Sequence, residues 1–278
     1  FQSYALWPHM TVARNVGYPL EVAGVRGAEY AARVGAALAT VGLDGLGERR
    51  PAQLSGGQRQ RVALARCLVM EPALVLLDEP LANLDVHLRA AMLDEFASFH
   101  DKTGATMVYI THDQAEAMTL ADRIAVMDDG RVQQIATPRA LYREPATAMV
   151  GAFIGQGTMV HARVLAPAGD GPVQEGWAEV ELLGLTARLR CPPGQIPGEA
   201  LVCLRPESLE PAASGTPGTL TARIMRATYK GGRIEIDARA EAAPEISLRL
   251  HVADGMRVRA DERLALRIVD GWVIPGAG

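Results

Sequence analysis

Two adjacent carboxylates follow a short apolar run in the first third of the sequence. The run "LVLL" ends directly before Asp78 and Glu79, and a short, wholly apolar run followed by acids is typical of a strand buried on both faces of a parallel sheet. Proteins of this architecture place reactive groups at the carboxyl ends of their strands. There Asp78 could hold Mg²⁺ through water, and Glu79 could orient or deprotonate an attacking water. Taken alone, the pair is equally compatible with a solvated acidic turn.

A second candidate is the stretch "LSGGQ", which contains Leu54, Ser55, Gly56, Gly57 and Gln58. The serine offers a hydroxyl group and the glycines offer unhindered amides at the start of a predicted helix, where free N–H groups and the helix dipole favour a phosphate. Ser-Gly-Gly is also common turn chemistry. The flanking leucine and glutamine and the following "RQR" make the pattern specific.

A third candidate, His112, lies just past a second apolar run, "TMVYI". Most such histidines are ordinary surface residues. A position beyond the end of a strand also suits a donor to a γ-phosphate, because reactive groups gather at that edge of a parallel sheet.

Periodicity predicts six elements that would position these residues. In chain order they are a helix over residues 29–41 capped by Gly42, a helix from residues 55–57 to residue 71, a strand over residues 73–77, a helix from Asp85 to Gly104, a strand over residues 106–110, and a helix opened by a capping box over residues 113–116. The order strand, helix, strand, helix predicts a βαβ arrangement and a layered α/β domain.

The pattern changes beyond this α/β part. "RIAVMDDGRVQQI" predicts a hairpin that turns at Asp129-Gly130. After residues 153–157 helical periodicity is replaced by short alternating runs between Pro/Gly-rich turns, which predicts an all-β second domain. The expected domains are therefore residues 1–155 and residues 156–278.

Composition narrows the choice of partners. The formal net charge is −4 and the pI is about 5.9, so a nucleic-acid partner is not expected, since phosphate contact depends on basic residues. No apolar run approaches the roughly 18 to 20 residues that span a bilayer. The three cysteines, Cys67, Cys191 and Cys203, have no metal-like spacing and are interpreted as reduced packing residues of a cytosolic protein.

With these motifs in view, most of residues 1 to 155 resembles the ATP-binding subunits of ABC transporters. In the order of that family, the matching motifs are Gln2 in "FQSYALWPHMTV" as the Q-loop, Leu54 to Gln58 as the signature, Leu74 to Glu79 as the Walker B strand, Leu81 to Asp85 as the D-loop, and His112 as the switch histidine. Ala82 departs from the serine of many importers. The resemblance implies an α/β P-loop NTPase-type ABC ATPase domain, here incomplete and with a helical subdomain, followed by an all-β OB/TOBE-like barrel domain.

The resemblance also implies residue roles, with ATP and Mg²⁺ as cofactors. Gln2 would sense Mg²⁺ and the γ-phosphate, and Asp78 would serve Mg²⁺. Glu79 would be the general base and His112 would steady the transition state. The signature residues would contact ATP held by the second subunit of a head-to-tail homodimer, with Asp85 helping to join the two sites.

Two further segments resemble parts of importer ATPases. Tyr4 to Val12 is similar to the segment that receives a coupling helix from the membrane permease subunits, although a buried aromatic cluster is a compatible interpretation. Thr137 to Gly155, with the later "VCLRPESL" of Val202 to Leu209, looks like the bridge into a TOBE-type regulatory tail. The implied protein is peripheral to the cytoplasmic face of the inner membrane, with a substrate-binding protein as an indirect partner.

The implied function is ATP-driven solute uptake, of iron, polyamine, sugar or phosphonate type. Two alternatives stay open: a soluble ABC ATPase outside transport, disfavoured by the acidic balance, and a truncated, non-catalytic dimerising or regulatory module. The second rests on the missing phosphate loop. That loop needs a lysine after a glycine, whereas Lys102 follows Asp101 and Lys230 follows Tyr229. Because the Q-loop glutamine is already residue 2, we expect that the loop precedes these residues, and that the 278-residue chain alone neither binds nor hydrolyses ATP.

Overall fold

The computed structural model describes residues 6–81, 86–166 and 176–276, and the chain divides into two compact units, residues 1–120 and 121–278. Each unit has its own hydrophobic core. The expected residues Gln2 and Asp85 lie outside the described residues. The division between units falls before the hairpin expected to turn at Asp129-Gly130, whereas the domain boundary expected at residues 155/156 stays a prediction.

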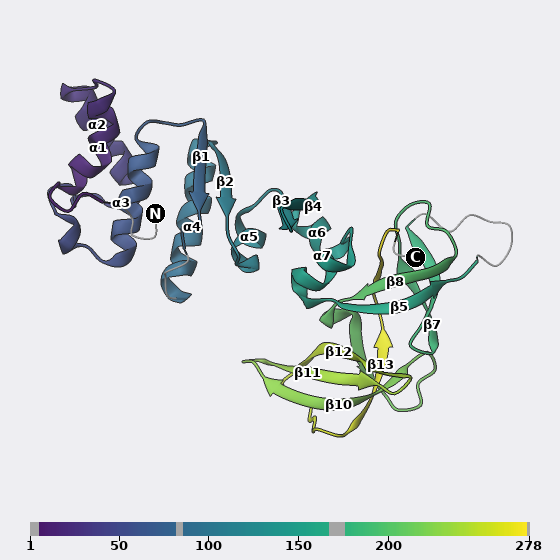
Figure 1. Ribbon diagram of the computed structural model, residues 1–278. Coiled ribbons are helices and arrows are strands. Elements are labelled where there is room, and N and C mark those ends of the chain that lie inside the picture. The colour runs from purple at the N-terminus through teal and green to yellow at the C-terminus, as the bar shows by residue number, and fades with distance from the viewer. Residues whose placement is uncertain (1–5, 82–85, 167–175, 277–278) are drawn as a thin grey trace. The chain divides into compact units, whose positions relative to one another are not determined.

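Three helices open the first unit: α1 (Val12–Val22), α2 (Gly27–Thr40) and α3 (Gly56–Leu68), with a 3₁₀ turn over Pro51–Gln53 before α3 (Figure 1). The helix expected over residues 29–41 is confirmed as α2. Gly42 follows its end with φ +63°, the left-handed conformation that favours glycine. The second expected helix is confirmed as α3, and its apolar side chains pack in the core of this unit.

The predicted βαβ arrangement is also confirmed. Strand β1 (Leu74–Asp78), helix α4 (Val86–Thr103), strand β2 (Thr106–Ile110) and helix α5 (Gln114–Leu120) follow in order, and Figure 1 shows the two strands side by side. The strands are parallel, with Leu76 opposite Val108 and Asp78 opposite Ile110. Their carboxyl ends therefore meet at one edge.

The expectation that this strand pair is buried on both faces is wrong. Val75 is 4% exposed in the core that includes Phe96 of α4, but Leu76 is 70% exposed. Val108, opposite Leu76, is exposed too. Side chains alternate between the two faces along a strand. Helix α4 covers one face of the pair, and no described residues cover the other. The apolar run therefore predicts burial on both faces, whereas the structure buries only one.

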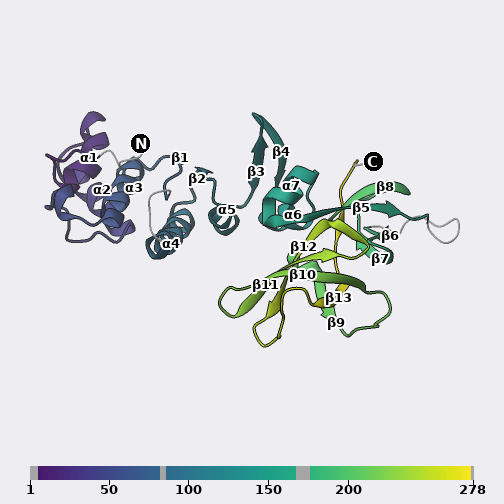
Figure 2. The ribbon, with the colours of Figure 1, turned by 60° about the horizontal axis from the view of Figure 1, so that its bottom comes forward.

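The second unit begins with the predicted hairpin, formed by β3 (Ile124–Asp128) and β4 (Arg131–Ala136); Figure 2 shows it as two neighbouring arrows. Asp129 and Gly130 have φ +46° and +69°, as expected for a tight two-residue turn. Two short helices follow, α6 (Pro138–Arg143) and α7 (Ala148–Phe153), with a 3₁₀ turn over Ile154–Gln156.

The remainder of the second unit is all β, as predicted. Its strands are β5 (Thr158–Val164), β6 (Trp177–Leu182), β7 (Leu185–Arg190), β8 (Gly198–Leu204), β9 (Leu209–Ala212), β10 (Leu220–Tyr229), β11 (Arg233–Ala240), β12 (Ala243–Ala253), β13 (Arg263–Ile268) and β14 (Trp272–Val273), with a 3₁₀ turn over Pro206–Ser208. Strands β14, β7, β6, β5 and β8 close into a barrel, and β12, β11, β10, β13 and β9 form a five-stranded sheet. The closed barrel is consistent with an OB-like fold.

A buried arginine joins the two short helices to this β structure. The Arg205 side chain, 6% exposed, donates from Nε to the Tyr142 carbonyl at 3.0 Å, from Nη1 to the Gly151 carbonyl at 2.8 Å, and also to the Ile154 carbonyl. Its guanidinium lies 4.4 Å from the centre of the Tyr142 ring. Main-chain carbonyls, rather than a carboxylate, thus satisfy this charge.

The expectation that the cysteines are packing residues is confirmed for two of the three. Cys191 and Cys203 are buried and free, whereas Cys67 is free but exposed on α3. No helix of the described residues has the length and apolar character needed to cross a bilayer.

Candidate functional site

The carboxyl ends of β1 and β2 bring two of the expected site residues into contact. Oε1 of Glu79 lies 3.2 Å from Nδ1 of His112. Both side chains are open to solvent, at 49% for the glutamate and 74% for the histidine. Asp78 is the last residue of β1 and is exposed at the same edge. A carboxylate, an imidazole and a second carboxylate thus face water together.

The backbone holds Glu79 in an unusual conformation. Its φ is +43°, in the left-handed region that residues other than glycine seldom adopt. Its N–H donates to the Ile110 carbonyl at 2.9 Å, which extends the β1–β2 pairing by one bond beyond Asp78. Such a conformation costs about 1–3 kcal/mol and persists only where the surroundings enforce it. The bond to β2 fixes the direction in which the Glu79 side chain leaves the sheet.

The exposed carboxylates fit Mg²⁺ chemistry of one particular kind. Among the described residues there is no group of three His, Cys, Asp or Glu side chains suited to a metal ion, so a site made of protein groups alone is not seen in that part of the chain. Mg²⁺ commonly takes one or two carboxylates and completes its shell with water and substrate phosphates. Asp78 fits the role of such a single carboxylate ligand.

The turn between β2 and α5, which carries His112, is held by hydrogen bonds on both sides of it. Asp113 caps α5, because its Oδ1 accepts from the Ala115 N–H at 2.8 Å, and its own N–H donates to Thr111 Oγ1 at 2.9 Å. The expected capping box is therefore only half correct. The Glu116 carboxylate does not return to Asp113; it accepts from Thr111 Oγ1 at 2.7 Å and from the Tyr109 hydroxyl at 2.9 Å.

An arginine of α4 completes this network. Nη1 of Arg89 lies 3.1 Å from Asp113 Oδ2, and its Nε lies 3.6 Å from Oε1 of the buried Glu116. Burial, and then the hydrogen bond to Glu116, raise the pKa of the Tyr109 phenol, so the phenol stays a donor. The network fixes the residues on either side of His112 and leaves the imidazole free to contact Glu79.

The predicted signature residues lie at the start of α3. Ser55 Oγ accepts from the Gln58 N–H at 3.2 Å, and Gln58 Oε1 accepts from the Ser55 N–H at 3.0 Å, a reciprocal capping box. Both bonds use acceptor oxygens, so the hydroxyl and the carboxamide keep their donors. Leu54 is buried below them, and Gly56 is partly open to solvent. The helix start can thus present several N–H and O–H donors to an anion.

Sequence reasoning missed Gln60, which connects the signature helix to the β1 end. Its side chain is buried and donates through Nε2 to the Pro80 carbonyl, directly after Glu79. Gln60 is one of the buried residues of α3, which are Gly57, Gln60, Val62, Leu64, Ala65 and Leu68. A polar residue within such a set was the available signal, because a buried amide is retained where it has a partner. Tyr109 and the bonding role of Glu116 were missed for a different reason: their partners come together only in the fold.

The structure thus brings Asp78, Glu79 and His112 to one edge and the signature to one helix start. Within the described residues, no hydrogen bond or ion pair joins Leu54–Gln58 to that edge.

The segment expected to contact a permease is described from Leu6 onward. Its Trp7 donates its main-chain N–H to Asn15 Oδ1 at 2.9 Å, and its ring centre lies 4.4 Å from that of Tyr18. The Arg66 guanidinium lies 4.9 Å from the centre of the Trp7 ring. An aromatic cluster is therefore present, and Pro8 and His9 beside it are exposed.

Two parts of the chain match models of known protein families. The ABC transporter family matches residues 1–82, and the TOBE domain family matches residues 202–274. The chain therefore belongs to the ABC transporter family and carries a TOBE domain in its C-terminal half.

Three relatives illustrate the similarity. The chain is 43% identical over 244 residues to the Fe(3+) ions import ATP-binding protein FbpC 1 of Rhizobium meliloti, covering 87% of this chain and 66% of the relative. It is 44% identical over 240 residues to the spermidine/putrescine import ATP-binding protein PotA of Frankia alni, covering 83% and 51%. It is 53% identical over 159 residues to the sn-glycerol-3-phosphate import ATP-binding protein UgpC 1 of Rhizobium johnstonii, covering 57% and 43%. The chain thus spans about two thirds of the length of the iron-import relative.

Proposed function

We propose that this chain forms part of the ATP-hydrolysing subunit of an ABC importer, which couples ATP binding and hydrolysis to solute uptake. The observation that carries the proposal is the Glu79–His112 contact at the carboxyl ends of two paired parallel strands. An exposed carboxylate beside an exposed imidazole suits the activation of a water next to a bound phosphate. The names of the import ATP-binding relatives support the transport class.

In this proposal each residue at the β1–β2 edge has its own task. Glu79 orients a water and accepts its proton, and His112 donates to the γ-phosphate from the ring nitrogen that does not face Glu79. Asp78 would help to hold Mg²⁺, and the bound ion would neutralise charge on the phosphates. Gln2 would also sense Mg²⁺ and the γ-phosphate.

The signature residues serve a second copy of the subunit. Because Ser55, Gly56 and Gln58 keep donors at a helix start while no bond ties them to Glu79 within the described residues, they suit an ATP molecule held by another subunit in a head-to-tail homodimer. Leu54 and Gly57 support that helix start from below, and Asp85 would help to join the two sites. Gln60 couples the signature helix to the catalytic edge through Pro80.

The remaining partners follow from the importer class. The exposed Pro8 and His9 beside the Trp7 cluster offer a surface for permease subunits, and a substrate-binding protein would act through them. The subunit would then be peripheral to the cytoplasmic face of the inner membrane. The solute is of the iron, polyamine or sugar-phosphate type named for the relatives.

A second possibility has its own observation: these 278 residues contain no lysine after a glycine, so the β- and γ-phosphates lack their usual backbone nest and lysine here. In that case the chain by itself acts as a non-catalytic dimerising or regulatory module.

One experiment tests both. The chain is compared with a fusion in which a segment carrying a G-x-x-x-x-G-K-[ST] phosphate loop is joined to it. The fusion should bind Mg-ATP and hydrolyse it, and Glu79→Gln in the fusion should retain binding while losing about 10²-fold in turnover. The unfused chain should show neither activity by calorimetry and phosphate release. Normal turnover by the Glu79→Gln fusion would refute the assigned base, and micromolar ATP binding by the unfused chain would refute the need for the loop.

A further inference from the structure

Three arginines form a row across the outer face of the five-stranded sheet. Arg223 of β10 lies directly opposite Arg263 of β13 on one side and Arg239 of β11 on the other. Directly opposite residues share a face of an antiparallel sheet. Their neighbours along the strands, Ala222 and Ala238, are buried, so the arginines project away from the core, and all three are exposed.

Two members of this row have no acidic partner among the residues that the structure describes. Arg263 forms a 2.7 Å ion pair with Glu241. No hydrogen bond or ion pair engages the side chains of Arg223 and Arg239 within the described residues, although like charges placed directly opposite destabilise a sheet. The chain has more acidic than basic residues, with a formal net charge of −4, so a shortage of acidic side chains does not explain the unpaired arginines. The repulsion between these arginines destabilises the isolated fold, and a bound anion would relieve it.

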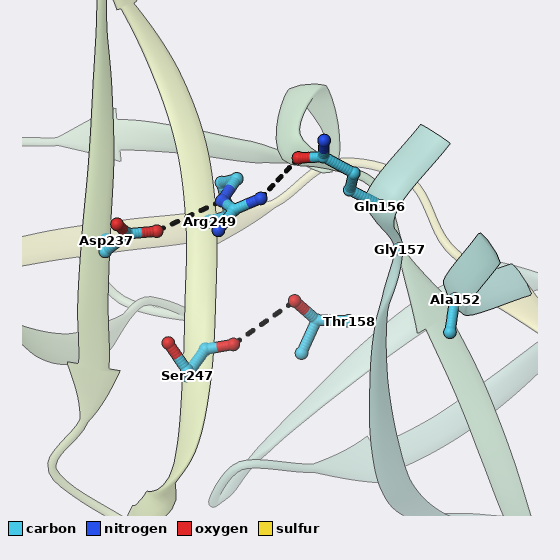
Figure 3. A pocket seen from close by; sticks show the side chains of 7 residues that line it. All are labelled: Ala152, Gln156, Gly157, Thr158, Asp237, Ser247 and Arg249. Atoms are coloured by element: carbon cyan, nitrogen blue, oxygen red, sulfur yellow. Dashed lines mark hydrogen bonds and ion pairs between the residues drawn. The ribbon is translucent and has the colours of Figure 1, made fainter. Parts of the chain in front are cut away.

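A polar pocket opens where this row ends. Ser247 of β12 lies directly opposite Arg239 and lines a pocket of about 270 Å³ with Ala152, Gln156, Gly157, Thr158, Asp237 and Arg249 (Figure 3). The sheet supplies one wall, and the stretch from the end of α7 to the first residue of β5 supplies the other. This pocket and the unpaired arginines are therefore neighbours on the same surface.

Existing bonds shape the pocket and neutralise its own charge. Nε of Arg249 donates to Asp237 Oδ1 at 3.0 Å and its Nη1 donates to Gln156 Oε1 (Figure 3). Thr158 Oγ1 donates to the Ser247 carbonyl at 3.2 Å. The Arg249–Asp237 pair leaves no net charge there. The pocket thus offers hydroxyl and amide groups, while the unbalanced positive charge lies at its rim.

We propose that Arg223, Arg239 and the adjoining pocket bind a small phosphorylated ligand, with its phosphate on the two arginines and a hydroxylated body among Gln156, Thr158 and Ser247. Guanidinium groups recognise phosphate oxygens through paired N–H donors, and a dianion can satisfy two of them at once. A body of hydroxyl groups matches the polar lining. This site is independent of the nucleotide chemistry proposed for the first unit.

The test follows the arginine side-chain N–H signals of the 278-residue chain by NMR at constant ionic strength. Inorganic phosphate should shift the Arg223 and Arg239 signals saturably, and ribose 5-phosphate should do so at lower concentration because its body enters the pocket. Arg223→Gln or Arg239→Gln should weaken binding about tenfold or more. The matched control is Arg233→Gln, six residues from Arg239 on the same face of β11 and roughly 20 Å away, which should leave binding unchanged.

Two further arms separate the sources of the phosphate. Gln156→Ala should remove the advantage of ribose 5-phosphate over inorganic phosphate. Vesicles of phosphatidylcholine with phosphatidate should bind no better than either small anion. Shifts that fail to saturate, an equal loss in the Arg233→Gln control, or binding of vesicles without binding of the small phosphates would each overturn the proposal.

Discussion

In residues 1–120 the parallel pair β1–β2 buries one face and leaves Leu76 and Val108 exposed, whereas in residues 121–278 five strands close into a barrel whose buried side chains share one apolar core with the five-stranded sheet. Parallel strands of this kind are normally covered on both faces, and closure of a barrel removes strand edges. The sequence predicts a wholly apolar strand at β1 and alternating strands in the second unit, and both kinds need an apolar surface to pack against. What differs is whether the described residues supply the second surface that each strand needs.

The largest expected effect is a loss of stability in the second unit. Arg205→Ala should destabilise it by about 3 kcal/mol, because the carbonyls of Tyr142, Gly151 and Ile154 lose their buried donor. Thermal unfolding followed by far-UV circular dichroism, which registers loss of the β strands, measures the change. Arg267→Ala, at an exposed position of β13, is the control and should cost less than about 0.5 kcal/mol. Equal effects of the two variants would contradict the role given to Arg205.

A second prediction sharpens the contrast between the two faces of β1. Val75→Ala should cost about 2 kcal/mol because it removes packing atoms from the core, whereas Leu76→Ala should change stability by less than about 0.5 kcal/mol because its side chain is exposed. Urea denaturation of the 278-residue chain measures both. A large loss in the Leu76→Ala variant would mean that this face is covered in solution.

The smallest expected effect concerns the outer sheet face of the second unit. Arg239→Gln should raise the free energy of unfolding by a few tenths of a kcal/mol, since it removes like-charge repulsion with Arg223. The Arg233→Gln variant should leave it unchanged. Differential scanning calorimetry without phosphate is the measurement. A destabilised Arg239→Gln variant would show that the arginine row stabilises the fold.

Local patterns predicted most elements because their causes are local. Ser55 and Gln58 cap the same helix, Asp129-Gly130 requires left-handed backbone, and "TMVYI" has the composition of a strand. The contact between Glu79 and His112 was also accessible, because residues after neighbouring parallel strands meet at one edge.

The remaining features depend on partners distant in the sequence. Glu116 has the position of a capping-box residue, but its carboxylate accepts hydrogen bonds from the Tyr109 and Thr111 hydroxyls instead. Arg205 looks like an exposed charge in a turn, and only the fold places three carbonyls around it. The apolar run of β1 shows that the strand favours burial on both faces. It does not show which elements are present to cover those faces. Such features follow from tertiary contacts, which single-sequence periodicity does not encode.

The left-handed backbone at Glu79 has a consequence for protein engineering. Glycine or asparagine would adopt φ +43° with less strain than glutamate, so a library selected only for thermal tolerance would enrich those residues at this position. Such a library would discard the proposed base while appearing to improve the protein. Stabilisation campaigns on this chain would therefore need to hold residue 79 fixed, since robustness and turnover pull that position in opposite directions.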